Sequence, residues 1–199
     1  MTEWNTRHTL LLRAKDHEDE SAWEEFVYYY RPYLYLVARR MNLSHHDAEE
    51  ISQMVLLKLW DKMPSFDYSK QRGRFRGWLC TVTGNTVKNF LKSQKARLNR
   101  HEKVKREEVE GYLNGVSLPE IEEIAEREWR SYIANLAWDN VKEGLHENAR
   151  EAFLMFREGK KVTEISEALG VTEGSAYVYK KRVEQIVFKE IKRLEADIC

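Results

Sequence analysis

The sequence contains few of the residues that interrupt helices or crosslink chains. Only three prolines and nine glycines occur among its 199 residues, so helices are expected throughout. Its two cysteines, Cys80 and Cys199, have neither metal-ligand nor disulfide spacing, which argues against a disulfide framework. No apolar run is long enough to span a membrane, and the N-terminus shows no signal-peptide pattern, so a cytoplasmic protein is expected.

A net charge is also lacking, because thirty-three basic residues balance thirty-three acidic ones, but the charges are unevenly distributed. Residues 71–106 hold eleven Lys or Arg and one acid, Glu102, whereas residues 107–151 hold four basic and twelve acidic residues. Aromatic and amide side chains interleave the basic block, a combination suited to phosphates and unstacked bases. The alternative is a solvated helix face beside a disordered acidic tether.

Apolar residues at three-and-four spacing predict the helices of an N-terminal domain. A stripe over residues 22–41 predicts a buried helix, which Pro32 is expected to kink or restart. Ser44 starts a capping-box pattern and a helix over residues 46–63, which Pro64 ends. The far side of that helix combines an acidic rim with apolar side chains, which fits either a partner-docking face or an ordinary surface.

A third helix, residues 75–94, has an apolar face and a polar face. At about 100° per residue, the apolar face comprises Phe75, Leu79, Val82, Thr86 and Phe90. The polar face comprises Trp78, Asn85, Lys88, Asn89, Lys92 and Lys95. Trp78 either stacks on a nucleobase, which is worth roughly 1 to 3 kcal/mol, or is partly buried against Phe66 of the preceding loop.

The second half of the chain predicts a linker followed by a helix-turn-helix unit. Periodicity fades over residues 98–125, which predicts the linker. In the segment VTEISEALGVTEGSAYVYKKR, Ile165 points inward, Gly170 suits a left-handed turn and Thr172 caps the second helix. Candidate DNA contacts near the start of that helix are Thr172, Glu173, Ser175, Ala176, Tyr177, Tyr179, Lys180, Lys181 and Arg182. A helix-turn-helix that serves only for packing is the alternative.

Three segments, in this order, make the chain resemble the extracytoplasmic-function (ECF) sigma factors of the sigma-70 family. HDAEEISQMVLLKLW with PSFD is similar to the family's polymerase-docking helix, and GRFRGWLCTVTGNTVKNFLKSQKAR to its promoter-melting and minus-ten-reading helix. REAFLMFREGKKVTEISEALGVTEGSAYVYKKR is similar to its minus-thirty-five-reading domain. The resemblance implies an all-α fold with two small helical domains, residues 1–97 and 126–199, joined by a flexible linker over residues 98–125.

The resemblance also implies a function, which is to direct core RNA polymerase to promoters and to help separate the DNA strands without catalysis. The implied docking residues for the β′ clamp are Asp47, Glu50, Gln53 and Leu57. The implied minus-ten residues are Phe66, Arg74, Arg76, Trp78, Asn85, Lys88, Asn89 and Lys92, with Phe66 cupping a flipped base. Expected partners are core RNA polymerase, through the β′ clamp and β flap, and promoter DNA as duplex and melted strand. An anti-sigma protein is left open as a partner, and neither a cofactor nor a metal is expected.

Several points depart from this family pattern or compete with it. Met54 stands where the family often has an acid. Tyr177, Val178 and Tyr179 occupy positions that are often basic or hydroxylic, so readout there could rest on stacking, thymine-methyl contact or phosphate contact. The competing hypothesis is a stand-alone regulator that binds duplex DNA through its helix-turn-helix. An enzyme is not expected, since the adjacent His45 and His46 have no ligand partners at suitable spacing.

Overall fold

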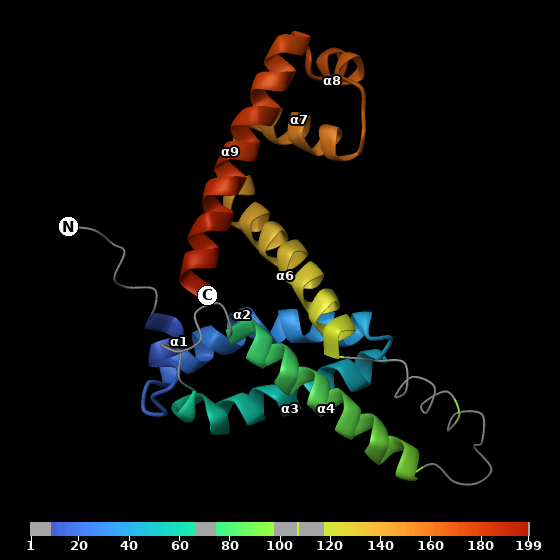
Figure 1. Cartoon of the computed structure of the whole chain (residues 1–199). Coiled ribbons are helices and arrows are strands. Elements are labelled where there is room, and N and C mark those ends of the chain that lie inside the picture. Colours follow the sequence, from blue (N-terminus) through green and yellow to red (C-terminus); the bar gives the residue numbers. More distant parts are fainter. Residues whose placement is uncertain (1–8, 67–74, 98–106, 108–117, 199) are drawn as a thin grey trace. The chain divides into compact units, whose positions relative to one another are not determined.

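A computed structural model describes residues 9–66, 75–97, 107 and 118–198, and all the elements within these ranges are helices (Figure 1). The prediction of an all-α fold is therefore confirmed. The chain divides into two compact units, of which the first comprises residues 1–130 and 197–199 and the second residues 131–196. The boundaries predicted at residues 97 and 126 concern functional domains and stay a prediction.

Helix α2 (Glu20–Arg40) is a long helix that lies wholly within the first unit, and α1 (Thr9–Arg13) precedes it. Asp19 caps α2, because its carboxylate accepts a hydrogen bond from the Ala22 backbone N–H at 3.0 Å. Arg13 also donates to this carboxylate, from Nε at 2.8 Å and from Nη2 at 3.0 Å. The Arg13 hydrogen bonds are the main reason that the pKa of the Asp19 carboxyl lies well below its usual value.

Of the two predicted effects of Pro32, a kink or a restart of the helix, the restart is excluded because α2 is continuous through Pro32. A proline in a helix leaves the carbonyl four residues earlier without its usual donor. That residue is Tyr28, and both Tyr28 and Pro32 are exposed, so water can satisfy the carbonyl. Buried residues on both sides of Pro32, such as Tyr30 and Leu34, hold the helix in one piece.

Two more helices complete the predicted part of the first unit. α3 (His45–Lys62) starts at Ser44, whose Oγ accepts a hydrogen bond from the Asp47 backbone N–H at 3.1 Å, so the predicted cap is confirmed. A 3-10 turn, η2 (Met63–Ser65), follows it. α3 packs against both α2 and α4 (Phe75–Arg97) (Figure 1). The predicted apolar face of α4 is buried.

Helix α6 (Leu118–Val141) starts inside the predicted linker, and its first half belongs to the first unit. The Trp129 ring is buried, with its centroid 5.9 Å from that of Tyr30 and 5.1 Å from that of Tyr33. The Tyr33 hydroxyl donates a hydrogen bond to the Ala125 carbonyl at 3.1 Å. Residues 118–125 are thus part of a packed helix, while residues 98–106 and 108–117 lie outside the described residues.

A buried charge also connects α6 to α2. Glu128 is only 4% exposed, and its Oε1 lies 2.8 Å from Nε of Arg40. A buried carboxylate is costly unless a cation compensates it. The pair therefore helps to fix how the first half of α6 lies along α2.

The second unit contains the second half of α6, the 3-10 turn η4 (Lys142–Gly144), α7 (Glu147–Arg157), α8 (Val162–Leu169) and most of α9 (Glu173–Ile198). Its core takes one small or branched residue from each of α7, α8 and α9, namely Ala152, Ile165 and Ala176. Partly buried side chains surround this core: Met155, Phe156, Val162, Leu169, Val171 and Tyr179. α7, α8 and the first half of α9 consequently form one packed group (Figure 1).

Candidate nucleic-acid interface and docking groove

Helix α4 presents a polar face to solvent, which we call the amide-and-lysine face. It comprises Asn85, Lys88, Asn89 and Lys92, of which Lys88 is half-buried and the other three are exposed. Lysine ammonium groups can hold phosphates, and side-chain amides can hydrogen-bond to base edges. The structure therefore brings together four of the predicted minus-ten residues on one accessible surface, and their role in DNA binding stays a prediction.

Arg76 does not belong to the amide-and-lysine face. At 100° per residue it lies roughly 170° around α4 from the centre of that face. Its Nη1 is 3.8 Å from Glu126 Oε2, and its guanidinium carbon is 5.4 Å from the centre of the Trp129 ring. Both partners come from α6, so Arg76 would have to share or leave them to hold a DNA phosphate.

Phe66 and Trp78 form a stacked aromatic pair. Their ring centroids are 4.6 Å apart at an angle of 29°, and Phe75 meets the Phe66 ring edge-on at 5.6 Å. Of the two alternatives for Trp78, the structure shows partial burial against Phe66. Phe66 itself is buried, so the Phe66–Trp78 pair would have to separate before Phe66 could cup a flipped base, and that role stays a prediction. Arg74, the remaining minus-ten candidate, lies outside the described residues.

The thiol of Cys80 is buried within the first unit. Loss of solvent raises the pKa of the Cys80 thiol to about 11. Burial also raises the pKa of the neighbouring Tyr33 hydroxyl above its ordinary value. Both groups are neutral at physiological pH, as expected for side chains that pack rather than react.

The predicted docking residues of α3 differ in their surroundings. Asp47 accepts hydrogen bonds from Gln94 Nε2 at 3.0 Å and from Ser44 Oγ at 2.7 Å, so it helps to hold the end of α4 against the start of α3. Glu50 and Gln53 are exposed. Leu57 is 67% exposed and adjoins other apolar side chains, and contiguous apolar surface of this kind is typical of a partner-binding site.

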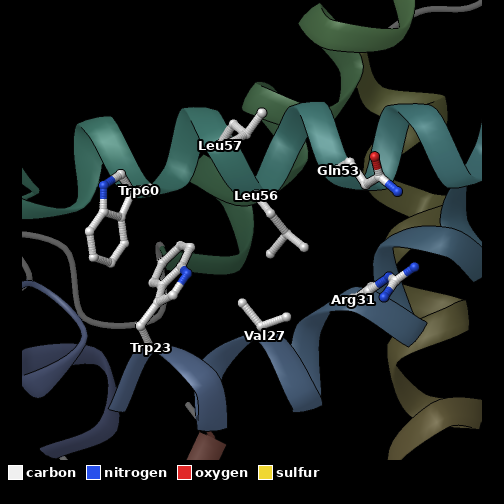
Figure 2. Close-up of a pocket in the computed structure, with 7 residues that line it drawn as sticks. All are labelled: Trp23, Val27, Arg31, Gln53, Leu56, Leu57 and Trp60. Carbon is white, nitrogen blue, oxygen red and sulfur yellow. The ribbon is translucent and has the colours of Figure 1, made fainter. Parts of the chain in front are cut away.

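Gln53 and Leu57 line a groove of about 600 Å³ between α2 and α3. We call it the α2/α3 groove, and its other lining residues are Trp23, Val27, Arg31, Leu56 and Trp60. Figure 2 shows Leu56 and Val27 pointing toward one another in its middle, while Trp23 and Trp60 stand together toward one end. Arg31 and Gln53 lie toward the other end (Figure 2). The groove is thus apolar in its middle and at the Trp23 and Trp60 end, and polar at the end where Arg31 and Gln53 lie.

Short-range contacts fix the side chains at both ends of the groove. His17 stacks on Trp60 with ring centroids 4.0 Å apart and donates a hydrogen bond from Nε2 to the Trp60 carbonyl at 3.0 Å. Trp23 meets Trp60 edge-on at 4.8 Å. At the polar end, Arg31 Nη2 is 3.0 Å from Glu49 Oε2. Sequence reasoning missed the groove because it assigned Trp23 and Val27 to the buried stripe of α2.

The helix-turn-helix turn in the second unit has the predicted geometry. Gly170 has φ 63° and ψ 35°, in the left-handed region that favours glycine. Thr172 caps α9, because its Oγ1 accepts a hydrogen bond from the Ser175 backbone N–H at 3.1 Å. These two predictions are confirmed.

The nine candidate residues of the helix-turn-helix do not share one face. Glu173, Tyr177, Lys181 and Arg182 are exposed, as is Thr172, whereas Ser175 is half-buried beside Thr172. Ala176 is buried in the core, where it is not accessible to DNA, and Tyr179 is half-buried against that core, so a DNA contact by Tyr179 stays a prediction. Lys180 lies over the Phe156 ring, with Nζ 5.0 Å from its centroid, so it is also partly engaged.

Two family models match these two regions of the chain. The model described as "Sigma-70 region 2" matches residues 26–97, which cover α3, α4 and most of α2. The model described as "Sigma-70, region 4" matches residues 136–185, which include the helix-turn-helix. The chain belongs to the sigma-70 family.

A curated relative is similar over a shorter stretch. The "ECF RNA polymerase sigma factor SigE" of Mycolicibacterium smegmatis is 30% identical over 71 residues, or 36% of this chain. The matched stretch spans about a quarter of that relative's length, 26%. The resemblance to the sigma-70 family found in the sequence is thus confirmed.

The two matches include the described candidate residues for polymerase docking and for DNA binding. Region 2 contains the docking candidates of α3, the α2/α3 groove from Val27 onward and the amide-and-lysine face. Region 4 contains the candidates from Thr172 to Arg182. The first half of α6, residues 118–130, falls between the two matches although it packs in the first unit.

Within the described ranges, no helix is both long enough and apolar enough to cross a bilayer. The same residues form no cluster of three or more His, Cys, Asp or Glu side chains that could bind a metal ion.

Proposed function

We propose that this chain is an RNA polymerase sigma factor of the ECF type, which acts in the cytoplasm and recruits core polymerase to specific promoters. The observation that carries the proposal is the presence of region 2 and region 4 matches, in that order, on one chain. The similarity to a named ECF sigma factor supports the ECF assignment. In this proposal the chain catalyses no reaction, and binding energy alone promotes strand opening.

The two units offer different DNA-binding chemistry. The exposed start of α9 suits the major groove of duplex DNA, which admits a helix and displays a distinct pattern for each base pair. The amide-and-lysine face of α4 suits a melted strand, because lysines track its backbone and amides reach unpaired bases. We assign duplex recognition at the minus-thirty-five element to the start of α9. We assign binding of the melted strand at the minus-ten element to the amide-and-lysine face of α4.

Core polymerase binding is assigned to the α2/α3 groove together with Leu57. A groove of about 600 Å³ with a large exposed leucine beside it is suited to an apolar anchor from a partner. The β′ clamp is the partner we assign to this surface, and the β flap is the partner we assign to the second unit. Glu50 and Gln53 would then lie at the polar rim of the first interface.

Run-off transcription tests the proposal directly. Bacterial core RNA polymerase is mixed with a library of genomic fragments, with and without the chain. Discrete transcripts that appear only with the chain, from start sites sharing two upstream elements, are expected. The absence of such transcripts, with polymerase shown to be active on another sigma factor, would overturn the proposal.

The same promoters separate this function from a stand-alone regulator. Footprinting of the chain alone on the selected duplex fragments should show weak protection, and adding core polymerase should extend it over the melted region. Strong protection by the chain alone, unchanged by polymerase, would support the regulator instead.

A further inference from the structure

The first half of α9 has its buried and outward residues on opposite sides. Ala176 and Val183 are fully buried. At 100° per residue, the side roughly opposite to them carries Gly174, Val178 and Lys181. All three are exposed. This outward side, rather than the whole start of the helix, is what α9 can present to the edges of base pairs.

Val178 is an unexpected residue on that side. It is apolar, 62% exposed, and β-branched, which lowers helix propensity slightly. Its exposed neighbour Tyr177 packs partly against the Phe156 ring, with centroids 5.6 Å apart, so packing accounts for the tyrosine. The position of Val178 among polar residues would be better explained by an apolar group on a ligand of α9.

Gly174, one helical turn earlier, is not required by the fold. Its φ is not positive, since the positive-φ glycines of the described residues are Gly159 and Gly170. A Cβ built at Gly174 would meet only Thr172 Oγ1, at 3.8 Å, which is ordinary contact. The missing side chain does, however, let another molecule approach the helix closely beside Val178.

We propose that Gly174 and Val178 form a notch that receives the C5-methyl group of a thymine in the major groove. This inference rests on the proposed function, in which α9 reads the upstream promoter element. The thymine methyl is the apolar group that base pairs display in the major groove, and it is matched by small apolar side chains. Lys181 lies next to the notch on the same side, where it can reach a phosphate or a guanine edge.

Replacing thymine by deoxyuridine tests the notch, because it removes only the methyl group. Promoters selected by wild-type holoenzyme are prepared with each thymine of the upstream element replaced in turn, and initiation is measured. At one position, the replacement should lower initiation by wild-type holoenzyme about fourfold. This factor corresponds to roughly 0.8 kcal/mol for one buried methyl-sized group. Holoenzyme containing Val178→Ala should use both DNAs more nearly equally.

Two further variants sharpen the result. Gly174→Val fills the notch and should lower initiation on the thymine promoter more than on its deoxyuridine counterpart. Phe188→Ala is the matched control, since Phe188 is an apolar residue of α9 with 61% exposure but lies outside the notch. It should keep the wild-type ratio between the two DNAs.

The outcomes separate this inference from the function beneath it. Suppose that wild-type holoenzyme selects promoters, but that Val178→Ala reduces the difference between thymine and deoxyuridine at no position. The notch is then refuted, while the proposed sigma activity stands. If no promoter is selected, the proposed function fails and the inference fails with it. Thermal melting of each variant checks folding, which should be preserved because both positions are exposed.

Discussion

Replacing Trp129 by alanine should destabilise the first unit and leave the second folded. The Trp129 ring is buried against the rings of Tyr30 and Tyr33 and beneath the guanidinium of Arg76. A tryptophan buries about 150 to 250 Å², which at about 25 cal/mol/Å² corresponds to roughly 4 to 6 kcal/mol as an upper estimate. Substitutions of this kind in cores cost about 3 to 5 kcal/mol, and we expect a loss of that size in the free energy of unfolding.

Urea titration with hydrogen-exchange mass spectrometry can measure this effect separately in each unit. With a urea dependence of about 1 to 3 kcal/mol per molar, the unfolding midpoint of the first unit should fall by at least about 1 M. Peptides from α2 and α4 should lose protection at lower urea. Peptides from α7 and α8 should exchange as in the wild type.

The matched control lies on the same helix. Trp138 belongs to the second unit, where its ring stacks on that of Phe153 at 5.1 Å. Trp138→Ala should reduce protection in the second unit and spare α2 and α4. Unchanged protection of α2 and α4 in Trp129→Ala would refute the assignment of the first half of α6 to the first unit.

Other predictions concern docking, the turn of the second unit and the buried thiol. Leu57→Glu should abolish capture of the chain by core polymerase in a pull-down, whereas Tyr28→Glu, at the equally exposed Tyr28 outside the groove, should not. Gly170→Ala should cost about 1 kcal/mol in a thermal denaturation experiment because of its positive φ, and Thr172→Ala about 0.5 to 2 kcal/mol through loss of the cap. Burial raises the pKa of Cys80 to about 11, so the thiol ionises first in the unfolded chain. Between pH 9 and about pH 11 the unfolded chain has lost this proton while the folded chain still holds it, which lowers the free energy of unfolding. The wild type should therefore lose stability relative to Cys80→Ala over this range and not below pH 9.

The features that could be predicted from sequence depend on short stretches of chain. A left-handed turn at Gly170 and a cap at Thr172 each follow from the chemistry of one residue and its neighbours. The buried face of α4 follows from helical periodicity alone. These local rules were sufficient to identify the helix-turn-helix and the main helices of the first unit.

The features that could not be predicted depend on distant partners or on the phase of a helix. Arg76 meets Glu126 and Trp129, which lie on the far side of the predicted linker in the sequence. The candidates on α9 included every side of its first turns, although a helix can present only one side to DNA, so the buried Ala176 was included among them. Burial of Trp78 against Phe66 was one of two alternatives that the sequence left open, and no pattern around Phe66 indicated that Phe75 would also meet its ring.

The position of Trp129 has a consequence for the order of events during synthesis. A ribosome releases α2, α3 and α4 well before it releases the tryptophan that closes over Tyr30 and Tyr33. Until then the nascent helices leave aromatic surface uncovered, which makes them substrates for chaperones and proteases. A pause in translation ahead of α6 would prolong that exposure, and the yield of active protein should fall accordingly.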